Sequence, residues 1–222
     1  AHHYFAPLQP WPDTDDDWFT LRAVGTELDD LSVGLAVAAV ALQNWHLTHS
    51  HCSRCGTPTV PRQAGWVRQC PADQSEHFPR TDPAVIMSVV DESDRLLLAR
   101  QNTWAPHHFS VLAGFCEPGE SAEAAVAREV YEEAGLTVTD LDYLGSQPWP
   151  FPASLMLGFH AKATGELHID GDEIGEAQWF SRDELAAACE LGDVQLPSRI
   201  SIAHRIIQRW YGNELPLEWI RV

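Results

Sequence analysis

The sequence predicts a mixed α/β (α+β) protein in which a short cysteine-bearing segment precedes a larger α/β domain. Two apolar runs, 84–90 and 95–100, flank the polar turn 91–94 and are typical of paired strands. Two helices are marked farther along the chain, one by an alanine-rich run that ends at Gly135 and one by a Ser-x-x-Glu capping sequence at Ser181. A C-x-x-C pair lies upstream of all these elements.

The composition is that of an acidic globular chain. The 222 residues are 45% hydrophobic, which is ample for a packed core, and 14 Lys and Arg against 32 Asp and Glu give a formal net charge of −18. Phosphate backbones and anionic membranes attract basic faces, so a nonspecific nucleic-acid or membrane-surface binder is disfavoured. The five Cys are an odd number and favour thiol or metal chemistry over a disulfide framework. We therefore expect a cytoplasmic protein.

The first 50 residues contain an acidic segment and an apolar helix. The acidic run 13–17 is expected to be a solvated surface turn. The most apolar run spans 33–42, and Asp29 or Asp30 can cap a helix that ends near His46. This run is shorter than the roughly eighteen residues that a membrane span needs. We expect a buried helix and no membrane contact.

Three cysteines, Cys52, Cys55 and Cys70, have the spacing of a zinc knuckle with one thiol missing. A complete zinc ribbon uses two C-x-x-C knuckles for tetrahedral zinc. Here Asp73 stands where the last Cys would lie, and His77 is another donor nearby in the sequence. The segment either binds structural zinc with Asp73 or His77 as the fourth ligand, or it is a metal-free knuckle.

The segment 114–136 places three glutamates on a helix directly after a glycine-punctuated turn. Ser121 can cap this helix. Residues three and four apart are neighbours on a helix, so Glu129 meets both Glu132 and Glu133, and each like-charged pair costs about 0.2–0.5 kcal/mol. Folding does not require this crowding. Mg²⁺ and Mn²⁺ explain it, because they take carboxylate oxygens as ligands and use them to hold a substrate's phosphates.

The spacing G-x5-E-x7-R-E-V-x-E-E-x-G-L resembles, at every position, the signature of the Nudix hydrolases, which cleave nucleoside diphosphates linked to another moiety. Its seven invariant letters are filled by Gly114, Glu120, Arg128, Glu129, Glu132, Glu133 and Gly135. A second segment, S-Q-P-W-P-F-P-A-S-L-M at 146–156, resembles the array that marks the NADH pyrophosphatase branch. Its prolines fix φ and remove donors, so we expect a stiff extended loop that presents Trp149 and Phe151.

The resemblance implies the Nudix sandwich, with a mixed β-sheet between helices. Further strands are expected at 154–163 and 177–180, and a final amphipathic helix at 200–210. Full-length relatives carry a longer N-terminal domain, and the first residue here is not Met. The expected parts are the C-terminal remainder of an N-terminal domain with the buried helix at 1–50, a small zinc-ribbon-like segment at 51–80, and the Nudix hydrolase domain at 81–222.

The resemblance also implies a role for each residue of the site. The residues expected to carry catalysis are Glu120, Arg128, Glu129, Glu132 and Glu133. The expected ligands of Mg²⁺ or Mn²⁺ are the carbonyl of Ala113 and the carboxylates of Glu129, Glu133 and Glu173. Either Glu132 or Glu133 is expected to take the proton of the attacking water, and the sequence does not distinguish them. Glu120 and Arg128 are expected to pair and hold the loop against the helix.

Substrate contacts are implied on several segments. Phe115 and Phe78 are expected to be stacking faces, and Phe78 is a candidate for contribution by a partner subunit, because these enzymes are typically homodimers. The other expected contacts are Gln147, Pro148, Trp149, Pro150, Phe151, Pro152, Ala153, Ser154 and Ala203. The implied reaction is hydrolysis of NAD(H) to nicotinamide mononucleotide and AMP, with removal of NAD caps from RNA 5′ ends. The alternatives are hydrolysis of ADP-ribose or another nucleoside diphosphate derivative, and a non-catalytic nucleotide sensor.

Overall fold

The protein is described by a computed structural model that covers residues 19–169 and 171–221. The acidic turn expected at 13–17 lies outside the described residues. The chain divides into two compact units. The small unit comprises the described residues up to Asp82 together with Pro148–Ser154, and the sheet unit comprises Pro83–Gln147 and the described residues from Leu155 onward.

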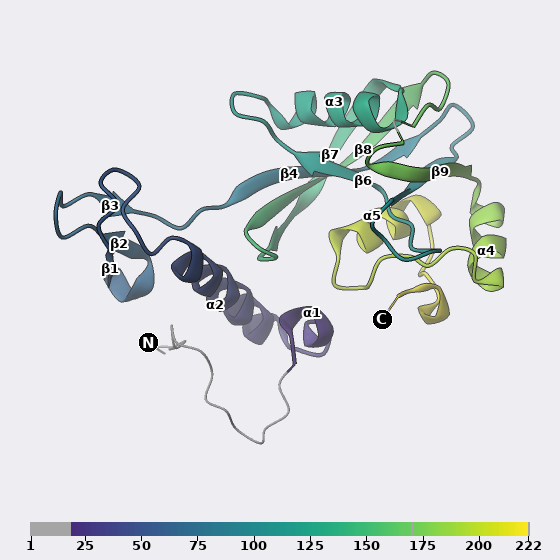
Figure 1. The fold of residues 1–222 in the computed structure, drawn as a ribbon. Helices are drawn as coiled ribbons and strands as arrows, with labels where there is room; N and C mark the ends of the chain where they lie inside the picture. Colours follow the sequence, from purple (N-terminus) through teal and green to yellow (C-terminus); the bar gives the residue numbers. More distant parts are fainter. Residues whose placement is uncertain (1–18, 170, 222) are drawn as a thin grey trace. The chain divides into compact units, whose positions relative to one another are not determined.

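A six-stranded sheet forms the centre of the sheet unit (Figure 1). Its strands are β4 (Asp82–Val90), β5 (Leu96–Gln101), β6 (Leu112–Phe115), β7 (Thr137–Trp149), β8 (Ser154–Thr164) and β9 (Ile174–Phe180). The order is β7-β8-β4-β5-β9, and β6 pairs with β4 outside this path. The expected turn joins β4 to β5, because Asp91 accepts hydrogen bonds from the N–H groups of Ser93 and Arg95.

Helices cover both faces of this sheet (Figure 1). Helix α3 (Ala122–Ala134) lies on one face, and α4 (Arg182–Leu191), α5 (Ile202–Tyr211) and a 3₁₀ turn (Leu217–Trp219) follow β9. Successive strand residues point to opposite faces, so Leu97 packs in the cluster of Val126 on α3 and Leu98 packs in the cluster of Ile207 on α5. The expected α/β arrangement of a sheet between helices is confirmed.

Capping side chains set the ends of the helices in the sheet unit. Ser121 accepts a hydrogen bond from the N–H of Ala124 (3.2 Å), and Gly135 ends α3 with φ of 69°. Ser181 and Glu184 form the expected capping box at the start of α4. Helix α3 therefore begins and ends, and α4 begins, where the local signals predict.

Strands β6 and β7 lie outside the strands predicted from the sequence. Strand β7 has no continuous apolar run that would mark it in the sequence, and its residues are half-buried or exposed throughout. The extended loop expected at 146–156 is instead the end of β7, the turn 150–153 and the start of β8. The prediction of a long loop is wrong in extent, since the two strands run into the proline-rich segment and leave only four residues between them.

The small unit combines two helices with a three-stranded sheet. Its elements are α1 (Leu21–Val24), α2 (Asp30–Thr48), β1 (Val60–Arg62), a 3₁₀ turn (Gln63–Gly65), β2 (Val67–Gln69) and β3 (Glu76–His77). Asp29, one of the two expected caps, accepts the N–H of Ser32 (2.9 Å) and begins α2.

A buried arginine fastens α2 to this sheet. Arg68 on β2 is 8% exposed, and its Nη1 donates to Nδ1 of His46 (2.8 Å). The other ring nitrogen of His46, Nε2, lies 2.8 Å from the carbonyl oxygen of Gly65. Arginine has no acceptor, so Nδ1 of His46 must accept and Nε2 must carry the proton that it donates to Gly65. The ring is therefore neutral, with one tautomer selected.

Helix α2 is longer and more exposed than the sequence analysis predicts. It has 19 residues and ends at Thr48, two residues beyond the predicted end near His46, and only Trp45 and His46 are buried. By length and composition alone it could cross a membrane, a test that core helices of soluble proteins and signal sequences also pass. The predictions of a buried helix and of one too short for a span are therefore wrong.

The neutral His46 makes the stability of the small unit depend on pH. Burial lowers the pKa of His46 below the ordinary value of 6.5, and the charge of Arg68 lowers this pKa further. The unfolded chain therefore takes up the proton first as pH falls. The contribution of His46 to stability is fully present above pH 6.5 and is lost as pH falls below this value toward the lowered folded-state pKa.

We expect amide protection in α2, measured by hydrogen exchange, to weaken from about pH 7 to about pH 5, and we expect His46→Gln to flatten this dependence. His49→Gln, which changes an exposed histidine next to the same helix, is the control and should follow the wild-type curve. Equal pH dependence in the two variants would show that His46 is not the group responsible.

Candidate functional site

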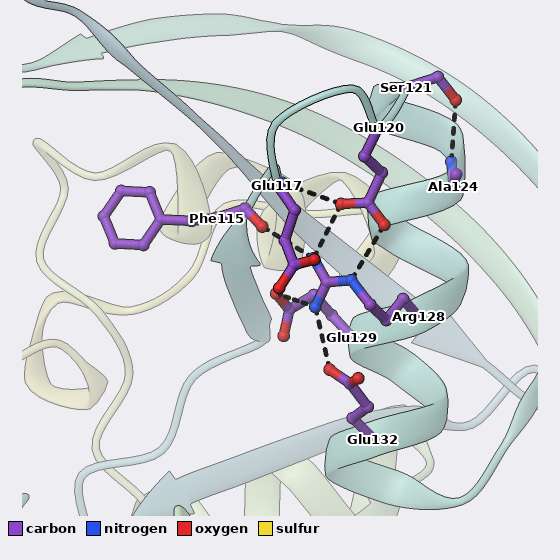
Figure 2. A network of polar contacts seen from close by, with 8 residues as sticks. All are labelled: Phe115, Glu117, Glu120, Ser121, Ala124, Arg128, Glu129 and Glu132. Atoms are coloured by element: carbon purple, nitrogen blue, oxygen red, sulfur yellow. Dashed lines mark hydrogen bonds and ion pairs between the residues drawn. The ribbon is translucent and has the colours of Figure 1, made fainter.

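Arg128 organises the acidic side of α3 and the turn before it (Figure 2). Its Nε and Nη2 donate to the two carboxylate oxygens of Glu120, each at 2.9 Å. Its Nη1 donates to Glu129 (2.8 Å) and Glu132 (2.9 Å), and Nη2 also donates to the carbonyl of Phe115 (2.9 Å). These contacts use all five N–H groups of the guanidinium. The structure thus contains the pair of Glu120 and Arg128 that the sequence predicts.

The turn that leads into α3 is closed by the same glutamate. Glu120 accepts a hydrogen bond from the N–H of Glu117 (3.0 Å), and the N–H of Glu120 donates to the carbonyl of Glu117 (3.0 Å). The hydrogen bond from Arg128 holds the pKa of Glu120 below its ordinary value, and the N–H of Glu117 acts in the same direction. Glu120 therefore stays ionised as a structural anchor of the turn.

Glu129 lies directly against β6. Its side chain is only 12% exposed, and a Cβ atom on Gly114 would overlap its carboxylate. Glycine is needed at 114 because the backbone and the carboxylate approach closely. Burial raises the pKa of Glu129, and the charges of Glu132 and Glu173 raise it further, although Arg128 opposes them. A hard divalent cation would relieve this repulsion and would find oxygen ligands here, so the residues fit Mg²⁺ or Mn²⁺.

The three glutamates of α3 do not share one environment. Glu133 follows Glu129 by one helical turn and is 5% exposed, so it faces the protein interior. The side chain of Glu132 is 56% exposed and lies beside Arg128. The structure therefore buries Glu129 and Glu133 and leaves Glu132 toward solvent. The choice of proton acceptor between Glu132 and Glu133 stays a prediction.

Glu173 reaches the site from the segment that precedes β9. Gln101 donates to its carboxylate through Nε2 (3.0 Å), and the N–H of Asn102 donates to its carbonyl (3.0 Å). The side chain of Asn102 also donates to the carbonyls of Gly171 (3.0 Å) and Asp172 (2.9 Å). The charge of Glu173 acts on Glu129, so the structure brings the two expected ligands into electrostatic range.

Sequence reasoning missed Gln101 and Asn102, which position Glu173. They lie at and just beyond the end of β5, and Gln101 is 72 residues from its partner. No local pattern links an amide side chain to so distant a loop.

The remaining residues predicted for the sheet unit occupy separate positions. Ala113 pairs with Ile86 across β6 and β4, next to Gly114. Phe115 is 58% exposed, and Figure 2 shows its ring turned away from the carboxylates while its carbonyl faces Arg128. The ligand role of Ala113 and the stacking role of Phe115 stay predictions.

Gln147 and Ala203 support the start of α5. The amide of Gln147 donates to the carbonyl of Ile200 (2.6 Å) and accepts the N–H of Ile202 (2.7 Å). Ala203 is buried, and its N–H donates to Oγ of Ser201 (3.2 Å). Gln147 thus joins the end of β7 to this helix, and substrate contact by either residue stays a prediction.

The predicted substrate residues 148–154 and Phe78 belong to the small unit. The rings of Trp149 and Phe151 meet edge to face with centroids 5.0 Å apart, and Ser154 is buried. Phe78 follows β3 and is 63% exposed. The exposed ring of Phe78 is compatible with stacking, and substrate contact by each of these residues stays a prediction.

Four side chains form a compact donor cluster in the small unit. One donor atom each from Cys52, Cys55, Cys70 and Asp73 lies within 4.8 Å of the other three. Ser75 donates through its N–H (2.9 Å) and its hydroxyl (2.6 Å) to Oδ1 of Asp73. The second oxygen, Oδ2, is therefore left to face Cys52, whose sulfur is 3.6 Å away.

The other predicted donor, His77, is not in this cluster, and its Nε2 lies 3.2 Å from the Ser75 hydroxyl instead. Hydrogen bonding with Ser75 lowers the pKa of Cys52 to about 6, whereas burial raises the pKa of Cys70 to about 11. Three thiols and one carboxylate are a donor set that zinc accepts. Of the two candidates for a fourth ligand, the structure brings Asp73 to the thiols.

The close approach at Gly114 leads to a test of the carboxylate site. Gly114→Ala should displace Glu129 and weaken Mn²⁺ binding by about ten- to a hundredfold, the range for disturbing the support of a metal ligand. Binding can be followed by electron paramagnetic resonance of free Mn²⁺. Gly34→Ala is the matched control, because a Cβ at Gly34 meets nothing within 4 Å. Mn²⁺ affinity that is equal in the two variants would contradict the assignment of Glu129.

Known protein families match both parts of this chain, the part with the carboxylate helix and the part with the cysteine cluster. The NUDIX domain model matches residues 80–199, and the NADH pyrophosphatase zinc ribbon domain model matches residues 47–78. The chain is 50% identical to the NAD-capped RNA hydrolase NudC of Mycobacterium bovis, over 94% of this chain and 71% of the relative. It is 43% identical to Nudix hydrolase 19, chloroplastic, of Arabidopsis thaliana, over 84% of this chain and 43% of that relative.

The solved structures show the same fold. A NUDIX hydrolase from Nitrosomonas europaea matches with a TM-score of 0.53 and 24% identity, covering 74% of this chain and 94% of that protein. This likeness concerns the fold alone. The sequence models, the identity to curated relatives and the intact carboxylate helix lead to one conclusion: the chain belongs to the Nudix hydrolase family and carries the NADH pyrophosphatase type of zinc ribbon.

Proposed function

We propose that this enzyme hydrolyses the pyrophosphate of NAD(H) to nicotinamide mononucleotide and AMP, and that the same reaction removes NAD caps from RNA 5′ ends. The observation that carries the proposal is the presence in one chain of a Nudix carboxylate helix and a ribbon of the NADH pyrophosphatase type. The relative named NAD-capped RNA hydrolase supports the capped-RNA substrate, because half of the aligned residues are identical.

The residues of the sheet unit divide the work of this reaction. Glu129, Glu133, Glu173 and the carbonyl of Ala113 would hold Mg²⁺ or Mn²⁺, which would neutralise the pyrophosphate and lower the pKa of a water. Either Glu132 or Glu133 would accept the proton of the attacking water. Arg128 does not contact the substrate in this scheme, because its five donors are already engaged by neighbouring carboxylates and a carbonyl.

The ribbon holds structural zinc through Cys52, Cys55, Cys70 and Asp73 in our proposal. The compact donor set supports this, and so does the hydrogen bonding of Asp73, since Ser75 occupies one oxygen and leaves the other for the metal. Zinc bound here stabilises the fold, because metal-binding free energy is folding free energy in such knuckles.

Two rival functions remain distinct from this proposal. Hydrolysis of ADP-ribose or another nucleoside diphosphate derivative would use the same carboxylates, so only substrate preference separates it. A nucleotide sensor on the same scaffold would need no buried acidic cluster. The burial of Glu129 and Glu133, together with the complete set of hydrogen bonds from Arg128, favours an enzyme over a sensor.

We further propose a cytoplasmic homodimer that does not contact membranes, with parts at 1–50, 51–80 and 81–222. Helix α2 has the length of a membrane span. However, its Asn44 donates to the carbonyl of Pro150, and its His46 bonds to Arg68, so two of its side chains serve the fold of the small unit. The net charge of −18 disfavours tracking along RNA and leaves recognition of the 5′ end as the mode of binding.

The substrate assignment is tested with NADH and Mn²⁺. Wild-type protein should release reduced nicotinamide mononucleotide and AMP in equal amounts and should hydrolyse NADH faster than ADP-ribose, as resolved by chromatography. Glu133→Gln should keep the fold and lower kcat by roughly 10²–10⁴, the range for a positioned acid–base group. Faster cleavage of ADP-ribose would favour the rival pyrophosphatase, and no hydrolysis of either substrate would favour the sensor.

The fourth zinc ligand is tested by a pair of substitutions. Asp73→Ala should release zinc and lower the melting temperature, whereas His77→Ala should keep zinc at one per chain, as measured by elemental analysis. Asp73→Cys should restore a four-thiolate site and retain zinc against a chelator for longer than the wild type does. If the loss follows His77→Ala instead, His77 is the ligand, and if the wild type holds no zinc, the knuckle is metal-free.

A further inference from the structure

One side chain of α2 holds the turn between β7 and β8. Nδ2 of Asn44 donates to the carbonyls of Pro150 (2.9 Å) and Pro152 (3.2 Å). The N–H of Phe151 donates to the carbonyl of Trp149 (2.8 Å), so the turn is also closed on itself. Proline has no N–H, so this turn has few donors of its own. A single amide nitrogen from a helix more than a hundred residues away in the chain supplies two hydrogen bonds to it.

The aromatic rings of this turn are held from a second helix. The guanidinium of Arg22 on α1 lies 5.2 Å from the ring centroid of Trp149 and 5.0 Å from that of Phe151. Both distances are within the range of cation–π contacts. Asn44 therefore holds the backbone of the turn, and Arg22 packs on its rings.

The helix that carries Asn44 is itself anchored. His46 is two residues farther along α2, and it is hydrogen-bonded to Arg68 of β2 and to Gly65 of the 3₁₀ turn before β2. Arg68 is in turn held by Thr59, through Nε to the hydroxyl (2.7 Å) and Nη2 to the carbonyl (2.8 Å). Hydrogen bonds thus attach α2 to the ribbon at His46 and to the turn at Asn44, and all of these residues lie within the small unit.

We propose that Asn44 is a positioning residue that determines substrate specificity by fixing the turn 150–153, together with the adjacent Trp149, before substrate binds. The inference rests on the proposed function and takes these aromatic rings to contact the nicotinamide, which is the base that ADP-ribose lacks. A turn that is already ordered does not lose conformational entropy on binding. Loss of Asn44 therefore weakens binding of a ligand with two bases more than binding of a ligand with one, and it leaves the carboxylates of the sheet unit unchanged.

The test compares Asn44→Ala and Asn44→Asp with Gln43→Ala, a control on the same helix whose side chain donates no hydrogen bond to the turn in the described structure. Asn44→Asp keeps the shape of the side chain but replaces the donor with an acceptor that faces two carbonyls. We expect KM for NADH to rise about three- to thirtyfold in both Asn44 variants, with kcat within about twofold of wild type. The preference for NADH over ADP-ribose should fall by a similar factor, and Gln43→Ala should match the wild type.

Two results would overturn the proposal: KM for NADH unchanged in both Asn44 variants, or equal losses for NADH and ADP-ribose, which indicate a general effect on folding. Equilibrium binding of NADH without divalent metal, measured by calorimetry, separates this inference from the proposed function. If wild type binds NADH but does not cleave it, the proposed function fails, while a three- to thirtyfold weaker Kd in the Asn44 variants still supports the inference and an unchanged Kd refutes it.

Discussion

The acidic site depends on the guanidinium of Arg128. Like-charged neighbours on a helix each cost about 0.2–0.5 kcal/mol, and this helix carries several beside a turn that ends in another glutamate. Arg128 binds Glu120 in a bidentate manner and donates its other hydrogen bonds to Glu129, Glu132 and the carbonyl of Phe115. A lysine could not make these contacts together, because it lacks the planar fork. The turn, the helix and strand β6 are joined at this one group.

Arg128 does not neutralise the site. The pKa of Glu129 is still raised by burial and by the neighbouring carboxylates. The protein therefore holds a partly buried set of oxygens with excess negative charge, and the absence of a side chain at Gly114 lets strand β6 lie against them. This arrangement is unfavourable for folding alone and favourable for a divalent cation. The chemistry of the site thus arises from a balance in which one arginine organises the carboxylates without cancelling their charge.

The small unit uses a second arginine in a different way. Arg68 is buried, burial lowers its pKa, and its donors engage His46, Thr59 and the carbonyl of Ser50. A neutral histidine accepts one of these hydrogen bonds, and among the described residues no carboxylate forms an ion pair with the guanidinium. The carbonyls of the ribbon disperse the charge instead. This contact fixes α2 against the ribbon, and Asn44 of the same helix fixes the turn that follows Trp149.

The sequence by itself determined what depends on local spacing. The bounds of α3, the pair of Glu120 and Arg128 and the capping box at Ser181 follow from periods of three and four residues. Tertiary structure decided the burial of Glu133, the exposed length of α2, the hairpin at 150–153, the attachment of Glu173 and the choice of Asp73 over His77. These features require segments far apart in the chain to meet, and side-chain burial and long-range hydrogen bonds exist only once the strands have paired.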